Sequence, residues 1–128
     1  MAMAELPHDE ALALVAEIGA REREHYLEAI LKNIEQTFGG EPLYPTAESR
    51  SAHLLYFMVR DHALLDGTKR GTVIIFEEYL RRNDLPLLPT QAVGQLMNDI
   101  EDGRGRAHQE QLVTRICAEL AAAALAQE

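Results

Sequence analysis

The sequence predicts an all-α fold, a compact bundle of about five or six helices. Apolar residues recur three and four positions apart, as residues 27–34 illustrate, and this spacing is typical of amphipathic helices. The one run rich in β-branched residues, 73–76, has no second strand-like run to pair with, and the EEYLRR that follows it favours helix. We therefore predict a single helical domain over residues 1–128, with its core at about 9–127.

The first forty residues predict one long amphipathic helix. From Asp9 the chain runs without proline to the glycine pair at 39–40, which should end the helix, and Gly19 is a place for a bend. The charged segment REREH, residues 21–25, is expected on the solvated face of this helix. The next segment, residues 41–46, contains two prolines and is expected to be an extended connector.

Four further helices are predicted after this connector. Thr46 is a suitable N-cap for a second helix that ends near Arg60. A third helix is expected from about 68 to 83, apolar on most sides and central to the bundle. Thr90 is predicted to cap a fourth helix, which runs through about residue 101. A fifth helix occupies the remainder after a glycine-containing turn.

Composition narrows the classes of function. The formal net charge of −9 opposes binding to the phosphate backbone, so direct nucleic-acid binding is not expected. No apolar run reaches the ~18 residues that a membrane-spanning helix needs, and no signal pattern opens the chain. We therefore expect a cytoplasmic protein without a membrane partner. Cys117 is the only cysteine, and its neighbours predict a small buried hydrophobe rather than a reactive thiol.

The segment HALLDGTKR, residues 62–70, combines residue types suited to phosphate chemistry. Asp66 supplies the hard oxygen ligands that Mg²⁺ prefers. Lys69 and Arg70 stand at the predicted start of a helix, where free N–H groups and the helix dipole attract phosphate. His62 is the residue in this loop that serves as a general base near neutral pH. The alternative is an ordinary interhelical turn with solvated basic side chains.

A resemblance extends beyond this loop. HALLDGTKR resembles the motif of the Fic/Doc (death-on-curing) family, His-Pro-Phe-x-Asp-Gly-Asn-Lys-Arg in Doc-type members and with glycine in place of lysine in Fic-type members. The matching positions are His62, Asp66, Gly67, Lys69 and Arg70. The flanks TFGGEPLYPTAESRSAHLLYFMVRDH and LRRND are similar to the Fic/Doc region of RhuM-like proteins. The resemblance covers about residues 27–120 and implies a Fic/Doc-like helical domain.

The resemblance also implies a role for each matching residue. His62 would take the proton from a target hydroxyl, and Asp66 would be the Mg²⁺ ligand. The nucleotide would be bound by the backbone at Gly67 and Thr68 and by the side chains of Lys69 and Arg70. Tyr44 and Pro45 would fall near the flap, an extended segment on which family members dock the target chain by strand addition. A buried aromatic that closes the first loop is an equal alternative for Tyr44.

Three functions follow from this resemblance. Lys69 favours a Doc-like toxin that uses ATP and Mg²⁺ to phosphorylate a hydroxyl of a target protein, for which a translation factor is a plausible substrate and a small antitoxin protein a partner. Ala63, Leu64 and Thr68 depart from the motif and motivate the alternative of a degenerate domain that binds without turnover. Transfer of AMP to a hydroxyl is a further alternative, against which Lys69 and Val73 argue. The oligomeric state, including a homo-oligomer, stays open.

Overall fold

The computed structural model describes residues 3–66, 68–103 and 106–127. The chain is mostly helical, and its strands are only two residues long. In order, the elements are α1 (His8–Ala16), β1 (Arg21–Glu22), α2 (Tyr26–Ile34), β2 (Thr37–Phe38), β3 (Glu41–Pro42), α3 (Ala47–Arg60), β4 (Leu64–Leu65), α4 (Thr68–Arg82), α5 (Thr90–Asp102) and α6 (Arg106–Ala126). The predicted all-α class is confirmed.

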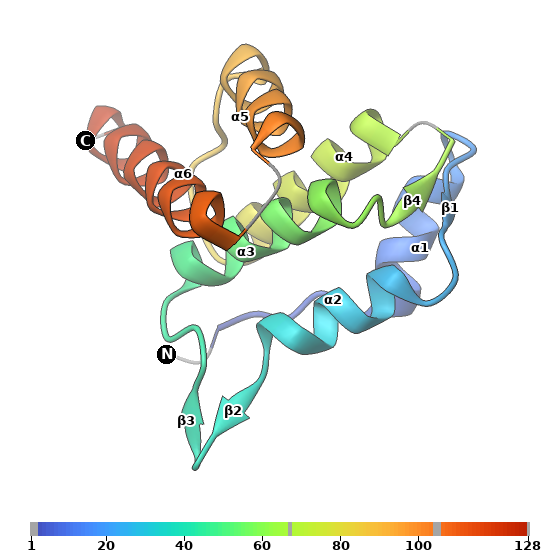
Figure 1. The fold of residues 1–128 in the computed structure, drawn as a ribbon, viewed down its shortest axis with the longest axis horizontal. Coiled ribbons are helices and arrows are strands. Elements are labelled where there is room, and N and C mark those ends of the chain that lie inside the picture. The colour runs from blue at the N-terminus through green and yellow to red at the C-terminus, as the bar shows by residue number, and fades with distance from the viewer. Residues whose placement is uncertain (1–2, 67, 104–105, 128) are drawn as a thin grey trace.

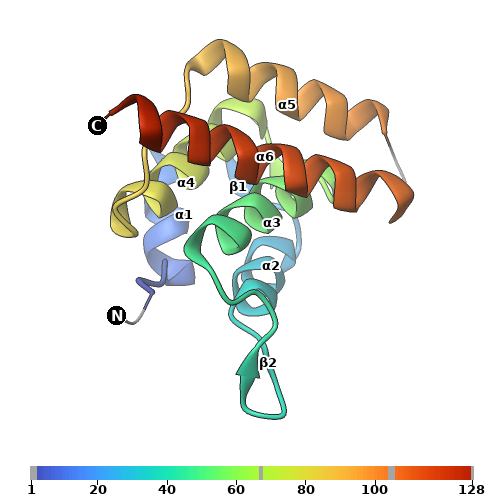
Figure 2. The same cartoon turned by 90° about the vertical axis from the view of Figure 1, so that its left-hand side faces the viewer.

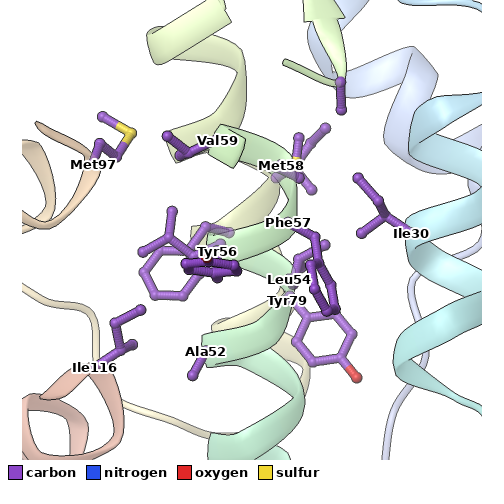
Figure 3. Close-up of a cluster of buried hydrophobic side chains, with 14 of the residues drawn as sticks. Ile30, Ala52, Leu54, Tyr56, Phe57, Met58, Val59, Tyr79, Met97 and Ile116 are labelled. Carbon is purple, nitrogen blue, oxygen red and sulfur yellow. The ribbon is translucent and has the colours of Figure 1, made fainter. Parts of the chain in front are cut away.

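Helix α3 lies at the centre of the molecule. It packs against α2, α4, α5 and α6, and Figure 1 shows α5 and α6 on one side of it and α1 and α2 on the other. Its side chains from Leu54 to Val59 are all buried, because neighbours cover this helix on several sides. Figure 3 shows this core, in which Ile30, Met97 and Ile116 reach α3 from three other helices.

The predicted bounds of α3 and α4 agree closely with the structure. The side chain of Thr46 accepts a hydrogen bond from the Ser49 N–H at 3.0 Å, as expected of an N-cap. The β-branched run 73–76 is helical within α4, as predicted. At α5 the expectation was wrong in one detail: Pro89 is the N-cap and Thr90 is the first helical residue, without a side-chain cap. Proline is suited to this boundary because it cannot donate a backbone hydrogen bond.

The prediction of one long N-terminal helix was wrong. Helix α1 ends at Ala16, and Gly19 follows with φ of +80°, a left-handed conformation that favours glycine and turns the chain. The segment 21–25 is therefore no solvated helix face. Its first two residues form β1, which pairs antiparallel with β4, so Arg21 lies opposite Leu65 and Glu22 opposite Leu64.

Glu22 explains why α1 and α2 separate at this point. Its Oε1 lies 2.7 Å from Nε2 of His8, and its Oε2 accepts a hydrogen bond from the Glu28 N–H at 2.8 Å. The second bond satisfies one of the free N–H groups in the first turn of α2. A single carboxylate thus joins the start of α1 to the start of α2, a contact between distant residues that helical periodicity does not reveal.

The predicted extended connector is part of a β-hairpin. β2 and β3 pair antiparallel around Gly39 and Gly40, both of which have positive φ. Figure 2 shows the hairpin projecting away from the helices, and Phe38 on it is 83% exposed. The hairpin leaves the bundle beside the N-terminus of α3. The motif loop follows the C-terminal end of α3. Because α3 has 14 residues, its two ends are about 21 Å apart.

Removal of the α3 N-cap is expected to destabilise the fold. Thr46→Ala leaves the Ser49 N–H without its acceptor and should lower the free energy of unfolding by about 1 kcal/mol. Urea denaturation followed by circular dichroism measures this change. Thr114→Ala, at an exposed position within α6, is the matched control and should cost little, because it removes no cap. Equal losses in the two variants would contradict the assigned cap.

Candidate functional site at the turn between helices α3 and α4

The turn begins with His62 in a left-handed conformation. Helix α3 ends at the C-cap Asp61, and the next residue, His62, has φ of +49°. The His62 N–H bonds to the Val59 carbonyl at 3.3 Å and the Ala63 N–H to the Met58 carbonyl at 3.1 Å. This pair of bonds is the Schellman motif, in which the left-handed position is usually glycine. A histidine there costs free energy, which is a reason to look for a function.

Backbone hydrogen bonds hold the turn against the segment after α1. β4 pairs with β1, and the Arg23 N–H donates to the Ala63 carbonyl at 2.8 Å. Leu64 is 1% exposed and Leu65 is 41% exposed, so the two neighbouring leucines of β4 face opposite ways. The buried Leu64 packs close to Gly71 of α4, where an added Cβ would lie only 2.6 Å from its Cδ1. The buried side chain of Leu64 therefore holds the loop against α4.

Asp66 also has a left-handed backbone, with φ of +54°, and its side chain is exposed. Its Oδ2 accepts a hydrogen bond from Arg21 Nη2 at 3.3 Å. Both side chains are more than 70% exposed, so solvent screens this ion pair and it contributes little to stability. An incoming cation could displace Arg21 at small cost. Asp66 thus remains a usable carboxylate ligand.

Helix α4 begins at Thr68, directly after the loop. Thr68 is the first residue of the helix, a conformation that a β-branched residue adopts without a positive φ. The Thr68 hydroxyl donates to the Leu64 carbonyl at 3.0 Å. Lys69 and Arg70 are exposed in the first turn of α4, and Lys69 Nζ makes a long hydrogen bond of 3.4 Å to Asn98 of α5. Gly67 lies outside the described residues.

The structure brings several of the predicted site residues together. His62, Thr68 and Lys69 line one small void of about 10 Å³, which is close to the volume that one water molecule requires. The other residues around it come from α3, α4 and α5: Val59, Thr72, Met97 and Glu101. The side chains of Asp66, in the loop, and Arg70, in the first turn of α4, are exposed. Asn98, Glu101 and Arg21 were not predicted, since they reach the loop only through tertiary packing.

Tyr44 and Pro45, which the resemblance would place near the flap, lie between β3 and the start of α3. They precede α3, and the Tyr44 ring stacks on His53 with centroids 3.8 Å apart. Its carbonyl accepts a hydrogen bond from Arg50 Nε at 3.2 Å. Tyr44 is thus partly buried against α3, and docking of a target chain at this segment stays a prediction. His53 is hydrogen bonded to the Ser49 carbonyl at 2.7 Å, as expected of a structural histidine.

His53 is expected to make the fold sensitive to acid. Burial lowers the pKa of His53 below its ordinary value of 6.5, against the opposing effect of its bond to Ser49. The unfolded chain therefore binds a proton more readily, and stability present above pH 6.5 is lost as the pH falls. Thermal unfolding between pH 7.5 and pH 5 should show a smaller drop in Tm for His53→Gln than for the wild type. The exposed His25→Gln is the control, and equal drops in all three proteins would contradict the argument.

In the described ranges, no three His, Cys, Asp or Glu side chains converge as a metal site. Within the same ranges, none of the helices has the length and apolar character to cross a bilayer. Burial raises the pKa of the Cys117 thiol, and Glu48 adds to this effect, which disfavours its reactive thiolate.

Comparison with known proteins leaves the family unassigned. No family model, no curated protein and no solved structure gives a significant match to this chain.

Proposed function

We propose that this chain transfers the γ-phosphoryl group of ATP to a hydroxyl of a target protein, as its resemblance to Doc-type members of the Fic/Doc family implies. The observation that carries the proposal is the common void lined by His62 and by Thr68 and Lys69. His62, the proposed base, follows the C-terminal end of α3 and lies beside the N-terminus of α4. Base and phosphate-binding groups need this proximity for an in-line transfer.

Phosphate would bind at the first turn of α4. The N-terminus of a helix offers free N–H groups and a partial positive charge, and α4 is 15 residues long. Lys69 and Arg70 add two cations to this turn. Their side chains are exposed, and the long bond from Lys69 to Asn98 is weak enough to exchange for a phosphate oxygen. The void itself is too small for a phosphate, so the nucleotide would occupy the exposed outer side of the turn.

The proposed reaction is a single displacement. The target hydroxyl oxygen attacks the γ-phosphorus, the bond from that phosphorus to the β–γ bridging oxygen breaks, and ADP leaves. His62 accepts the hydroxyl proton as the new phosphorus–oxygen bond forms. Asp66 would hold Mg²⁺ together with phosphate oxygens of the nucleotide, and the cation would neutralise the charge of the phosphates. A single protein carboxylate is compatible with this arrangement, because Mg²⁺ commonly takes most of its ligands from substrate and water.

The resemblance further supports a toxin whose substrate is a translation factor and whose partner is a small antitoxin protein. Expression of the wild-type chain without a partner is then expected to arrest bacterial growth. Purified protein added to cell extract with Mg²⁺ and γ-labelled ATP should label a protein band. Asp66→Ala should lose both effects, and Arg21→Ala should retain them, because Arg21 only occupies the Asp66 carboxylate. Growth and labelling that are unchanged in Asp66→Ala would sink the proposal.

A second candidate is a Fic/Doc-like module that binds a nucleotide or a protein without turnover. One contact favours it: the hydroxyl of Thr68, at the position where the family motif has asparagine, is bonded to the Leu64 carbonyl. Under this candidate the chain binds ATP but labels no target.

Thr68→Asn separates the two candidates. This variant restores the carboxamide of the family motif at the start of α4. If the wild type labels no protein and Thr68→Asn does, the binding module is correct for the natural chain and Thr68 is the residue that disables transfer. If the wild type already labels its target, the phosphotransferase is correct. Thr114→Asn, at an exposed position of α6, is the matched control and should leave labelling unchanged.

A further inference from the structure

A groove of about 490 Å³ lies between the C-terminal part of α6 and the segment that joins α4 to α5. Figure 2 shows this segment passing beside the C-terminal end of α6. On the α6 side the groove is lined by residues three and four positions apart, which share one face of the helix: Glu119, Ala122, Ala123 and Ala126. The opposite wall is formed by Leu87, Leu88 and Pro89. The lining is thus mainly apolar.

The walls of this groove are open to solvent, although they are apolar. Ala122, Ala126 and Pro89 are exposed, and Leu87 is 38% exposed. Leu125, which lies on α6 three residues after Ala122, is 68% exposed and extends the apolar surface beyond the groove. A single exposed leucine needs no explanation, but two of them beside a groove lined by alanines form a patch of the kind that marks a binding site. A partner can therefore reach this surface.

One carboxylate lies within this apolar lining. Glu119 lines the groove, and its Oε2 atom is buried without a hydrogen-bond partner among the described residues. A buried oxygen without a donor is unfavourable, and most such groups in folded proteins are paired. None of the described residues that line the groove is basic, so none of them can pair with this charge. A lysine or arginine of a binding partner would supply the missing donor.

The shape of the groove favours a helix as the partner element. Alanine side chains allow another helix to approach α6 closely, and the face from Glu119 to Ala126 is about 10 Å long, or two helical turns. A strand is less suitable, because strand addition uses backbone N–H groups, which Pro86 and Pro89 in the connecting segment lack. A second copy of this chain is also disfavoured, since it would bring another net charge of −9 and its own Glu119 to the interface.

We propose that this groove docks a basic amphipathic helix of a partner protein. Leucine-type side chains of that helix would contact Leu87 and the alanines of α6, and a lysine or arginine would pair with Glu119. The site is separate from the motif loop, because no residue lines both this groove and the void at His62. It does not rest on the proposed phosphotransfer.

The probe is a designed peptide of about 18 residues, long enough to be helical in water, with two leucines one turn apart on one face and an arginine a further turn away on each side. The two arginines allow either orientation along α6. Titrated into ¹⁵N-labelled protein and followed by NMR, this peptide should shift backbone amides in the segments 85–92 and 118–127. Peptides in which glutamate replaces the arginines, or serine replaces the leucines, should bind at least about tenfold more weakly. An absence of shifts, shifts confined to other segments, or equal binding of the three peptides would overturn the proposal.

Matched variants locate the site. Ala122→Lys places a cation in the groove, three residues from Glu119, and should weaken binding of the arginine peptide at least about tenfold. Ala124→Lys makes the same change at an exposed position of α6 outside the groove and should bind this peptide nearly as the wild type does. Glu119→Arg should reverse the preference, so that the glutamate peptide binds more tightly than the arginine peptide. An Ala122→Lys protein that binds the arginine peptide as the wild type does would contradict the assignment. Self-association of the wild type that Ala122→Lys abolishes, measured by sedimentation, would replace the partner helix by a second copy and overturn the proposal.

Discussion

His62→Ala is expected to lower the rate of phosphoryl transfer to the target by about 10²- to 10⁴-fold, the usual contribution of a general base. The affinity for ATP should change little, because the nucleotide is proposed to bind at the first turn of α4. Initial rates of label transfer and equilibrium binding of ATP measure the two quantities separately. His25→Ala, at another exposed position, is the control and should retain the wild-type rate. A His62→Ala protein that transfers label at the wild-type rate would contradict the assigned base.

At position 62, glycine should be more stable than alanine, although neither residue can serve as the base. His62 has φ of +49°, in the left-handed region where a side chain costs about 1–2 kcal/mol and glycine does not. His62→Gly should therefore be more stable than His62→Ala by about 1 kcal/mol, although both lose transfer. Denaturant unfolding gives this difference. If the His62→Ala protein is as stable as the His62→Gly protein, the assignment of backbone strain to this Schellman position is wrong.

Leu64→Ala is expected to destabilise the chain by about 2–5 kcal/mol, the range for a buried leucine whose removal leaves a cavity. That is a large share of the 5–15 kcal/mol typical of a folded domain, so Tm should fall markedly. Because Leu64 anchors the loop between His62 and Asp66, label transfer should also fall. The neighbouring Leu65→Ala is the control, since Leu65 is 41% exposed and its removal creates no cavity.

The contact between Leu64 and Gly71 can be tested by a double-mutant cycle. Gly71→Ala alone should destabilise by about 1–3 kcal/mol, because its methyl group would lie 2.6 Å from Leu64 Cδ1. In the presence of Leu64→Ala the same methyl group enters the space that the leucine leaves. The double variant should then be more stable than the sum of the two single effects predicts. Strict additivity would show that the two residues do not pack together.

The helices beside the loop could be predicted because their signals are local. Thr46 caps α3, the apolar run 73–76 continues into helix-forming residues, and the bounds of α3 and α4 followed from these signals. The N-terminal region could not be predicted in this way. The sequence indicated a bend at Gly19, but the break also depends on Glu22, whose carboxylate joins α1 to α2. The contacts of Glu22 leave no trace in the periodicity of nearby residues.

The residues of the candidate site also differ in whether local sequence signals predict their proximity. His62, Thr68 and Lys69 are within seven positions of one another, so a short turn between two helices was sufficient to bring them together. Asn98 and Glu101 lie about thirty residues further along and reach the loop through the packing of α5 against α3. Tyr44 precedes α3, whose other end leads into the loop, and it stacks on His53. Local spacing therefore predicts which residues of the turn come together but not the residues that surround them.

The most direct measurement uses two ATP preparations, one labelled at the γ-phosphate and one at the α-phosphate, each incubated with the purified chain, Mg²⁺ and cell extract. The account predicts that a target protein is labelled from γ and not from α, and that His62→Ala abolishes this label. Label from α would show AMP transfer instead. Absence of label from both positions, with the wild type and His62→Ala indistinguishable, would contradict the claim that this turn catalyses phosphoryl transfer.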